Sequence, residues 1–146
     1  MTDDELYPEL VMDHNRRPHN FRAMPGATKE VEGYNPLCGD KIRLFVKLDG
    51  ERVDDVSFQG NGCAYSTASA SLMTEAIKGK SREEALQLMA RFHDVMTTDH
   101  ASLGSLGKLE ALVGLRKNPL RVKCITLAWH ALKSALTSES EVVSTE

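Results

Sequence analysis

The sequence has no long apolar run and no excess of positive charge. None of its apolar stretches approaches the roughly 20 residues needed to cross a bilayer, and residues 1–5 are acidic where a secretory signal peptide is basic and then apolar. The 18 Lys and Arg residues are outnumbered by 21 Asp and Glu residues, which argues against nucleic acid as a partner. We therefore expect a cytoplasmic protein with no nucleic-acid or membrane partner.

Cysteine is scarce and its count is odd. Cys38, Cys63 and Cys124 cannot all pair with one another in disulfides, and a chain of this size in a reducing compartment has little need of them. The three thiols are therefore available for metal or sulfur chemistry.

Length and composition fit one globular domain. A chain of 146 residues, 41% apolar and 27% charged, can bury a core without disulfides. We expect residues 1–137 to form this domain. Residues 138–146 mix Ser, Glu, Thr and Val without a sustained apolar stripe, which predicts a flexible C-terminal tail to which we assign no function.

Hydrophobic periodicity predicts an α+β fold. We expect a small antiparallel sheet of about three strands, packed on one face by four to five helices, with a metal site exposed at one end. Asp49-Gly50 predicts a hairpin between two of the strands. Ser81 with Glu84 predicts a capping box, and Asn118-Pro119 predicts the start of the last helix. The expected strands are 29–34, 42–48 and 53–58, and the expected helices are 3–15, 66–78, 81–96, 106–115 and 119–136.

Three short segments carry the residues best suited to metal or sulfur chemistry. Residues 35–40 place a thiol, Cys38, and a carboxylate, Asp40, two positions apart in a turn-prone loop. Residues 60–63 place Cys63 after two glycines, just before a helix. Arg121 precedes Cys124 by three residues on a helix, so that its charge favours a thiolate there.

Three sulfurs and one carboxylate oxygen form a reasonable tetrahedral set for Zn²⁺, whereas hard cations prefer oxygen ligands. The spacing itself indicates a metal only weakly, because it lacks the paired C-x₂-C knuckles of common zinc modules. Each cysteine taken alone fits a buried core position about equally well, and an Asp after Gly more often caps its own loop. From the residues alone, these alternatives stay open.

Four motifs in order resemble those of SufU/IscU-type iron–sulfur cluster assembly proteins, which are NifU N-terminal-like. The resemblance covers roughly residues 3–137. It is closest to the zinc-dependent SufU branch, because Lys123 stands where IscU typically has a histidine and the segment from Cys63 to Cys124 is longer than in IscU. The motifs are Tyr7…Asp13-His14-x-Arg16-x-Pro18, Asn-Pro-Leu-Cys-Gly-Asp at 35–40, Gly-Asn-Gly-Cys at 60–63 with the following Tyr-Ser-Thr-Ala-Ser-Ala-Ser, and Arg-Val-Lys-Cys-Ile-Thr-Leu-Ala-Trp at 121–129.

The resemblance implies that zinc is held by Cys38, Asp40, Cys63 and Cys124. It also implies that Cys38 accepts persulfide sulfur from a SufS-like cysteine desulfurase. The positive charge of Arg121 makes it a second catalytic candidate, which would stabilise the anionic sulfur. Downstream cluster-assembly proteins would then be further partners. The implied function is that of a zinc-dependent sulfurtransferase.

Two other functions stay open at this point. The same thiolates suit a scaffold for an iron–sulfur cluster, with Asp40 keeping the cluster labile, and a zinc-stabilised interaction domain is the third hypothesis. We assign structural or surface roles to all five histidines and close helix packing to the Ser66–Ser71 run. These histidines are His14, His19, His93, His100 and His130.

Overall fold

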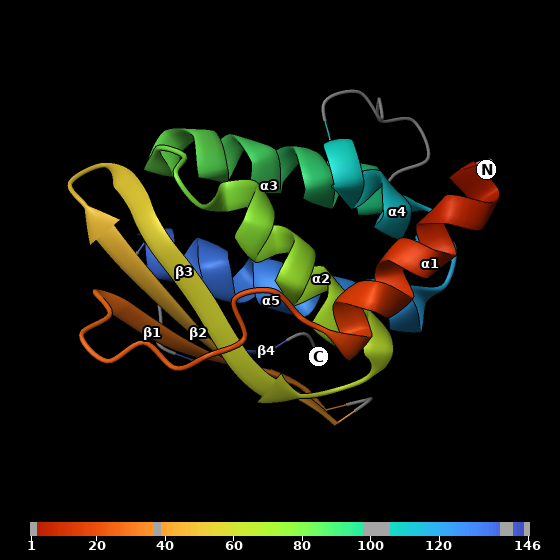
Figure 1. The fold of residues 1–146 in the computed structure, drawn as a ribbon, viewed down its shortest axis with the longest axis horizontal. Coiled ribbons are helices and arrows are strands. Elements are labelled where there is room, and N and C mark those ends of the chain that lie inside the picture. The colour runs from red at the N-terminus through yellow and green to blue at the C-terminus, as the bar shows by residue number, and fades with distance from the viewer. Residues whose placement is uncertain (1–2, 37–38, 98–105, 138–141, 145–146) are drawn as a thin grey trace.

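The structure is a computed structural model that describes residues 3–36, 39–97, 106–137 and 142–144, with side chains for 9–36, 39–97 and 106–137. It has the expected α+β architecture, with three antiparallel strands and the helices lying on one side of the sheet (Figure 1). In chain order the elements are α1 (Asp3–Arg16), β1 (Lys29–Asn35), β2 (Asp40–Asp49), β3 (Arg52–Asn61), α2 (Ala64–Ile77), α3 (Arg82–Thr97), the 3₁₀ helix η1 (Gly107–Leu109), α4 (Glu110–Val113), α5 (Pro119–Thr137) and β4 (Val142–Ser144).

The hairpin of β2 and β3 forms where Asp49-Gly50 predicts it. Gly50 has a positive φ of 60°, which glycine adopts without the steric cost of a Cβ. On the face toward the helices, Leu44 of β2 stands opposite Phe58 of β3, and both are buried. The alternation of buried and exposed residues along β2 fixes this register, because a slip by one residue would turn the apolar set outward.

A fourth strand, β4, was missed by the sequence analysis. Val142 and Val143 pair in parallel with Glu32 and Gly33 of β1, so the sheet order is β3-β2-β1-β4. The expected tail thus contains a short strand at these residues, whereas 138–141 and 145–146 lie outside the described residues. Its flexibility stays a prediction. Three residues are too short a run for a periodic signal, and β-branched valines extend the sheet only because β1 presents an open edge.

Helix α2 lies at the centre of the helical layer and is buried on nearly every side. Its small residues permit close approach to α5: the Ser69 hydroxyl donates to the Ile125 carbonyl at 2.6 Å and accepts from Trp129 Nε1 at 3.1 Å. This confirms that the serine-rich run is used for packing. These hydrogen bonds also fix the position of α2 relative to α5. That position matters because Cys63 caps α2 and Cys124 lies on α5.

The predicted helix starts are confirmed by their caps. Ser81 and Glu84 form the reciprocal capping box of α3, with Glu84 N donating to Ser81 Oγ at 3.0 Å and Ser81 N donating to Glu84 Oε1 at 3.1 Å. Asn118 Oδ1 accepts from the first backbone N–H groups of α5. The expected helix 106–115 is shorter than predicted and divided into η1 and α4, in keeping with the positive φ of Gly107.

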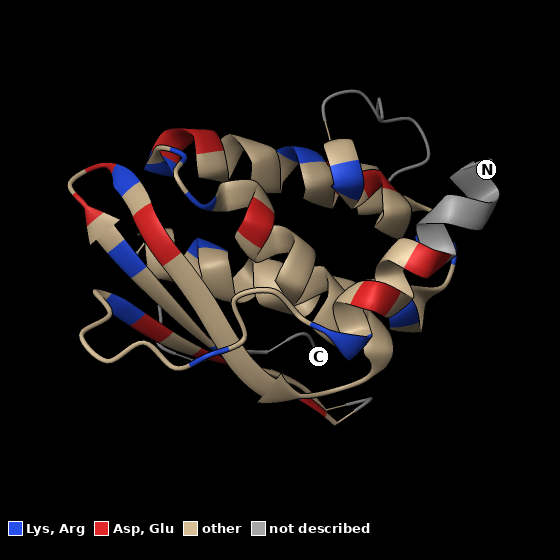
Figure 2. Ribbon diagram, in the orientation of Figure 1, with Lys and Arg blue, Asp and Glu red and all other residues tan. Residues whose placement is uncertain are grey.

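Acidic and basic residues are interspersed along the strands and helices of the described part (Figure 2). Within that part, no helix is both long enough and apolar enough to span a bilayer.

His130 on α5 gives the fold a testable pH dependence. Burial lowers its pKa, and nearby His93 and Lys133 lower it further. Because the unfolded chain then takes up the proton more readily, stability should fall as pH drops below about 6.5, by at most about 1.4 kcal/mol per pH unit for this group. We expect His130→Gln to flatten this slope in urea unfolding at pH 7.5, 6.5 and 5.5 with a chelator present. An unchanged slope would contradict the assignment.

Candidate metal centre

Asp40, Cys63 and Cys124 come together at one end of the domain. Asp40 begins β2, Cys63 lies between β3 and α2, and Cys124 lies in the second turn of α5. One ligand atom from each lies within 4.8 Å of the others. The structure thus brings together three of the four predicted ligands, from segments up to 84 residues apart, whereas Cys38 lies outside the described residues.

The Asp40 carboxylate is buried, with 1% of the residue exposed. Its Oδ1 accepts from the Cys63 backbone N–H at 2.8 Å, and its Oδ2 accepts from Asn35 Nδ2 at 3.1 Å. The carboxylate thus binds the backbone of the Cys63 loop rather than that of its own loop, and it also lies beside two sulfurs. Each of its oxygens keeps a second lone pair for a cation.

Asn35 is a site residue that the sequence analysis did not single out, although it begins the first cysteine motif. It is completely buried, and its Nδ2 donates both to Asp40 and to Cys124 Sγ, at 3.4 Å. The opposite amide orientation would set its oxygen against a carboxylate, so the hydrogen-bond network fixes the orientation. Asn35 thus positions two candidate ligands in the way that outer-shell residues of metal sites do.

Cys63 is the N-cap residue of α2, and its sulfur accepts from the Ser66 backbone N–H at 3.4 Å. The N-terminal end of a helix favours negative charge, including that of a thiolate. The side chain is only partly buried, whereas Cys124 is fully buried. The centre therefore has an inner side at α5 and a more accessible side at Cys63.

Gly62 leaves the space that the Asp40 carboxylate occupies. A Cβ at this position would lie 2.8 Å from Asp40 Oδ1 and 3.2 Å from Ser66 Oγ. We expect Gly62→Ala to displace the carboxylate and to weaken zinc binding about tenfold, measured by competition with a chromogenic chelator. Gly114→Ala, where a Cβ meets nothing within 4 Å, is the matched control. Equal zinc affinities for the two variants would show that the position of the Asp40 carboxylate does not depend on the space left by Gly62.

Arg121 lies in the first turn of α5, and its guanidinium carbon is 4.5 Å from the centre of the Tyr65 ring. This cation–π contact places a positive charge next to the start of α2, two residues after Cys63. The role assigned to Arg121, stabilising an anionic sulfur on Cys38, stays a prediction.

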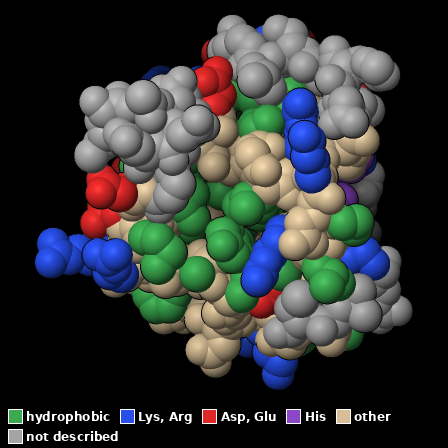
Figure 3. Space-filling view, turned by 90° about the vertical axis from the view of Figure 1, so that its right-hand side faces the viewer, with side chains coloured by type: hydrophobic (Ala, Val, Ile, Leu, Met, Phe, Trp, Pro, Cys, Tyr) green, Lys and Arg blue, Asp and Glu red, His purple; other side chains and the backbone are tan. Residues whose placement is uncertain are grey.

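The end of the molecule that carries the centre has an apolar middle with Lys and Arg side chains beside it (Figure 3). Two large exposed hydrophobic residues come from the helices at this end: Leu120 of α5 is 54% exposed and Met12 of α1 is 38% exposed. A contiguous apolar surface of this kind is typical of a face that meets another protein.

Among the described residues, a second group of potential ligand atoms comes from His14, His19 and Glu75. Both histidines were expected to have structural or surface roles. No sequence signal pairs them with Glu75, which lies 56 residues beyond His19 and reaches it only through the packing of α1 on α2.

Comparison with known proteins decides the family. Residues 6–141 match the model of the NifU-like N-terminal domain. The chain belongs to this family. Among its relatives, a Bacillus subtilis protein named zinc-dependent sulfurtransferase SufU is 45% identical over 137 residues, covering 93% of this chain and 92% of the relative. A Streptococcus pyogenes protein named iron–sulfur cluster assembly scaffold protein IscU is 46% identical over 134 residues, covering 91% and 84%.

The fold agrees with this assignment to the NifU N-terminal family. The crystal structure of a SufU from Fervidobacterium islandicum, described as a scaffold protein for the SUF system, superposes with a TM-score of 0.84 at 36% identity, covering 88% of this chain and 94% of that one. The chain is therefore of the SufU/IscU type, as its motifs predict. The two relatives carry different functional names at nearly equal identity, so the choice between sulfur transfer and scaffolding depends on the site.

The residues of the centre fit zinc. Zinc accepts both thiolate and carboxylate ligands and is usually held by four protein ligands in structural sites, and Cys38 would complete such a set. Around a tetrahedral zinc with Zn–S bonds of about 2.3 Å, ligand atoms are about 3.7 Å apart. The three described ligand atoms, within 4.8 Å of one another, need to move inward only slightly.

Proposed function

We propose that this protein is a zinc-dependent sulfurtransferase that accepts persulfide sulfur from a cysteine desulfurase and passes it on for iron–sulfur cluster assembly. It works in the cytoplasm, with a SufS-like desulfurase and downstream cluster-assembly proteins as its partners. The zinc ligands are Cys38, Asp40, Cys63 and Cys124, and Cys38 is the sulfur acceptor.

The observation that supports this proposal most is the convergence of two thiols and a buried carboxylate, held in part by Asn35. A bound zinc ion keeps its cysteine ligands deprotonated while restraining their reactivity. A centre of this kind can keep an acceptor cysteine deprotonated but unreactive until a partner protein binds. The name of the B. subtilis relative agrees with this function.

The transfer step conserves both atoms and electrons. The Cys38 thiolate attacks the outer sulfur of the desulfurase persulfide, a new S–S bond forms on Cys38, and the old S–S bond breaks with the desulfurase cysteine leaving as a thiolate. No external oxidant or reductant is needed. Arg121, held on the Tyr65 ring at the same end of the domain, supplies a positive charge for the anionic sulfur.

The exposed apolar residues at this end support docking of the desulfurase there. Leu120 and Met12, both exposed, would be covered in the complex, which brings the persulfide to the centre.

The proposal is tested by the turnover of a cysteine desulfurase with this protein as the acceptor. The reductant must be one that does not itself remove persulfides. We expect the wild type to stimulate turnover and Cys38→Ala to abolish the stimulation at unchanged desulfurase concentration. Undiminished stimulation by Cys38→Ala would rule out Cys38 as acceptor. The exposed variant Lys47→Ala, near the hairpin end of β2 and away from Asp40, serves as the control for nonspecific effects.

The second candidate function is an iron–sulfur scaffold. It is favoured by the carboxylate among the thiols, since an oxygen ligand would leave a cluster labile, and by the name of the S. pyogenes relative. Anaerobic purification distinguishes the two functions. One zinc per chain without sulfide supports the transferase, whereas iron and inorganic sulfide in equal amounts support the scaffold.

A further inference from the structure

A second cluster of metal-ligating side chains lies between the end of α1 and the last two turns of α2. His19 Nδ1 pairs with Glu75 Oε1, and His14 Nε2 lies 3.9 Å from Glu75 Oε2. The centroids of the His14 and His19 imidazole rings are 4.5 Å apart. One ligand atom from each of these three residues lies within 4.8 Å of the others.

Ser71 holds both histidines in place. Its hydroxyl lies 2.7 Å from His14 Nδ1 and accepts from the His19 backbone N–H at 2.7 Å. In the tautomer whose Nδ1–H donates to Ser71, the Nε2 of His14 directs a lone pair toward Glu75. Metal-binding histidines usually have their second nitrogen fixed by such a hydrogen bond.

His14 is shielded from water, with only 2% of the residue exposed. Its ring is fixed by its contacts with Ser71 and Glu75 rather than by solvent, as expected of a preorganised ligand.

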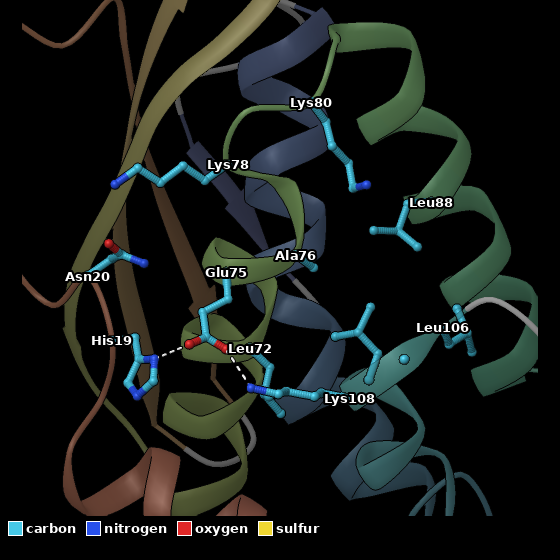
Figure 4. A pocket seen from close by; sticks show the side chains of 12 residues that line it. His19, Asn20, Leu72, Glu75, Ala76, Lys78, Lys80, Leu88, Leu106 and Lys108 are labelled. Atoms are coloured by element: carbon cyan, nitrogen blue, oxygen red, sulfur yellow. Dashed lines mark hydrogen bonds and ion pairs between the residues drawn. The ribbon is translucent and has the colours of Figure 1, made fainter.

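The cluster opens onto a cavity of about 780 Å³ that is lined by His19 and Glu75 and by apolar residues such as Leu72 and Leu88 (Figure 4). On this open side, Lys108 of η1 places its Nζ 4.0 Å from Glu75 Oε2. The lysine thus puts a cation beside the same oxygen that a metal would use. Because its side chain is 68% exposed, it has room to move away, but it then gives up its contact with Glu75 and competes with the metal to that extent.

We propose that His14, His19 and Glu75 bind a divalent first-row metal ion, with a fourth position open to the cavity. Two imidazoles and one carboxylate suit Zn²⁺ and its neighbours in the series, and three protein ligands leave a site for water. Around a metal at about 2.1 Å the ligand atoms are about 3.4 Å apart. His14 therefore needs to move slightly toward Glu75, whereas His19 and Glu75, which now pair directly, need to separate to admit the ion. The site goes beyond the proposed function, because it contains no thiolate.

This site is separate from the cysteine centre. Glu75 lies 12 residues beyond Cys63 along α2, which corresponds to about 18 Å of helix. The two sites therefore bind metal through different residues and give different spectra. Cobalt bound by thiolates shows a sulfur-to-metal charge-transfer band, whereas cobalt bound by nitrogen and oxygen shows only ligand-field bands.

The test is a titration with Co²⁺ of protein already loaded with one equivalent of Zn²⁺. We expect a second equivalent to bind with visible ligand-field absorption and without a sulfur charge-transfer band. Glu75→Gln and His19→Gln should each weaken this binding at least tenfold. Lys108→Ala should strengthen it about fivefold, because it removes a positive charge about 4 Å from the carboxylate. Glu83→Gln, an exposed acidic residue at the start of α3, is the matched control.

Glu75→Gln should lower the cobalt affinity and Lys108→Ala should raise it. These opposite changes distinguish a metal site from an ion pair with a purely structural role. If the ion pair is purely structural and binds no metal, neither variant changes cobalt binding. The proposal is overturned if the zinc-loaded protein takes up no second equivalent, if Glu75→Gln binds it as tightly as the wild type, or if Lys108→Ala leaves its affinity unchanged. Far-ultraviolet circular dichroism of each variant verifies that it is folded, and the result does not depend on any desulfurase.

Discussion

The Cys124→Ser variant should be purified without zinc. When zinc is present, it should also be markedly less stable than the wild type. Cys124 is fully buried on α5, accepts a hydrogen bond from Asn35 and lies within 4.8 Å of two other ligand atoms. Binding to the native state alone stabilises a protein by about 4 kcal/mol when the free ligand is a thousandfold above its Kd. The variant should lose this contribution in urea unfolding with zinc present.

Two controls separate metal loss from a simple packing defect. With a strong chelator present, wild type and Cys124→Ser should differ by only about 1–2 kcal/mol, which is the cost of a changed buried side chain. Ala131→Ser also buries a hydroxyl on α5 but should keep one zinc per chain. If the Cys124→Ser variant retained a full equivalent of zinc, Cys124 would not be a ligand.

Replacing Asp40 by asparagine should weaken zinc binding by at least tenfold and also destabilise the loop. The new amide can still accept from the Cys63 N–H through its oxygen. Its NH₂ group, however, would face Asn35 Nδ2, which now donates to Asp40 at 3.1 Å. Two donors in contact inside a buried site leave at least one of them unsatisfied.

The exchange Asn35→Asp with Asp40→Asn separates the two roles of Asp40. It restores a donor facing an acceptor, so it should recover part of the stability lost in Asp40→Asn, as measured by thermal unfolding in chelator. It should not recover zinc affinity, because the carboxylate is no longer at position 40 and Cys124 loses the Asn35 amide. Full recovery of zinc binding by the exchange would mean that Asp40 is only a loop cap.

Much of the fold was predictable because its signals are local. The Asp49-Gly50 hairpin, the Ser81 capping box and the Asn118 cap each depend on a few adjacent residues, and the structure confirms all three. Strand β4 was not predictable, because its three residues form a strand only by pairing with β1. Its stability comes from a tertiary contact that no local pattern contains.

The site divides in the same way. Asp40, Cys63 and Cys124 were identified because their motifs resemble a known family, and the structure brings them together. Asn35 belongs to the first motif, but an asparagine in a sequence does not indicate a metal site. Its role becomes clear only from the hydrogen bonds of its amide to Asp40 and Cys124. The cluster of His14, His19 and Glu75 depends entirely on how α1 packs on α2, which periodicity does not reveal.

The most direct test of sulfur transfer is mass spectrometry of the zinc-loaded protein after reaction with a cysteine desulfurase and cysteine, followed by alkylation and peptide mapping. We predict the added mass of one sulfur atom on the peptide that contains Cys38, with the peptides of Cys63 and Cys124 unchanged. Sulfur found on no cysteine, or on Cys63 or Cys124 with Cys38 unmodified, would contradict the proposal that Cys38 accepts the persulfide.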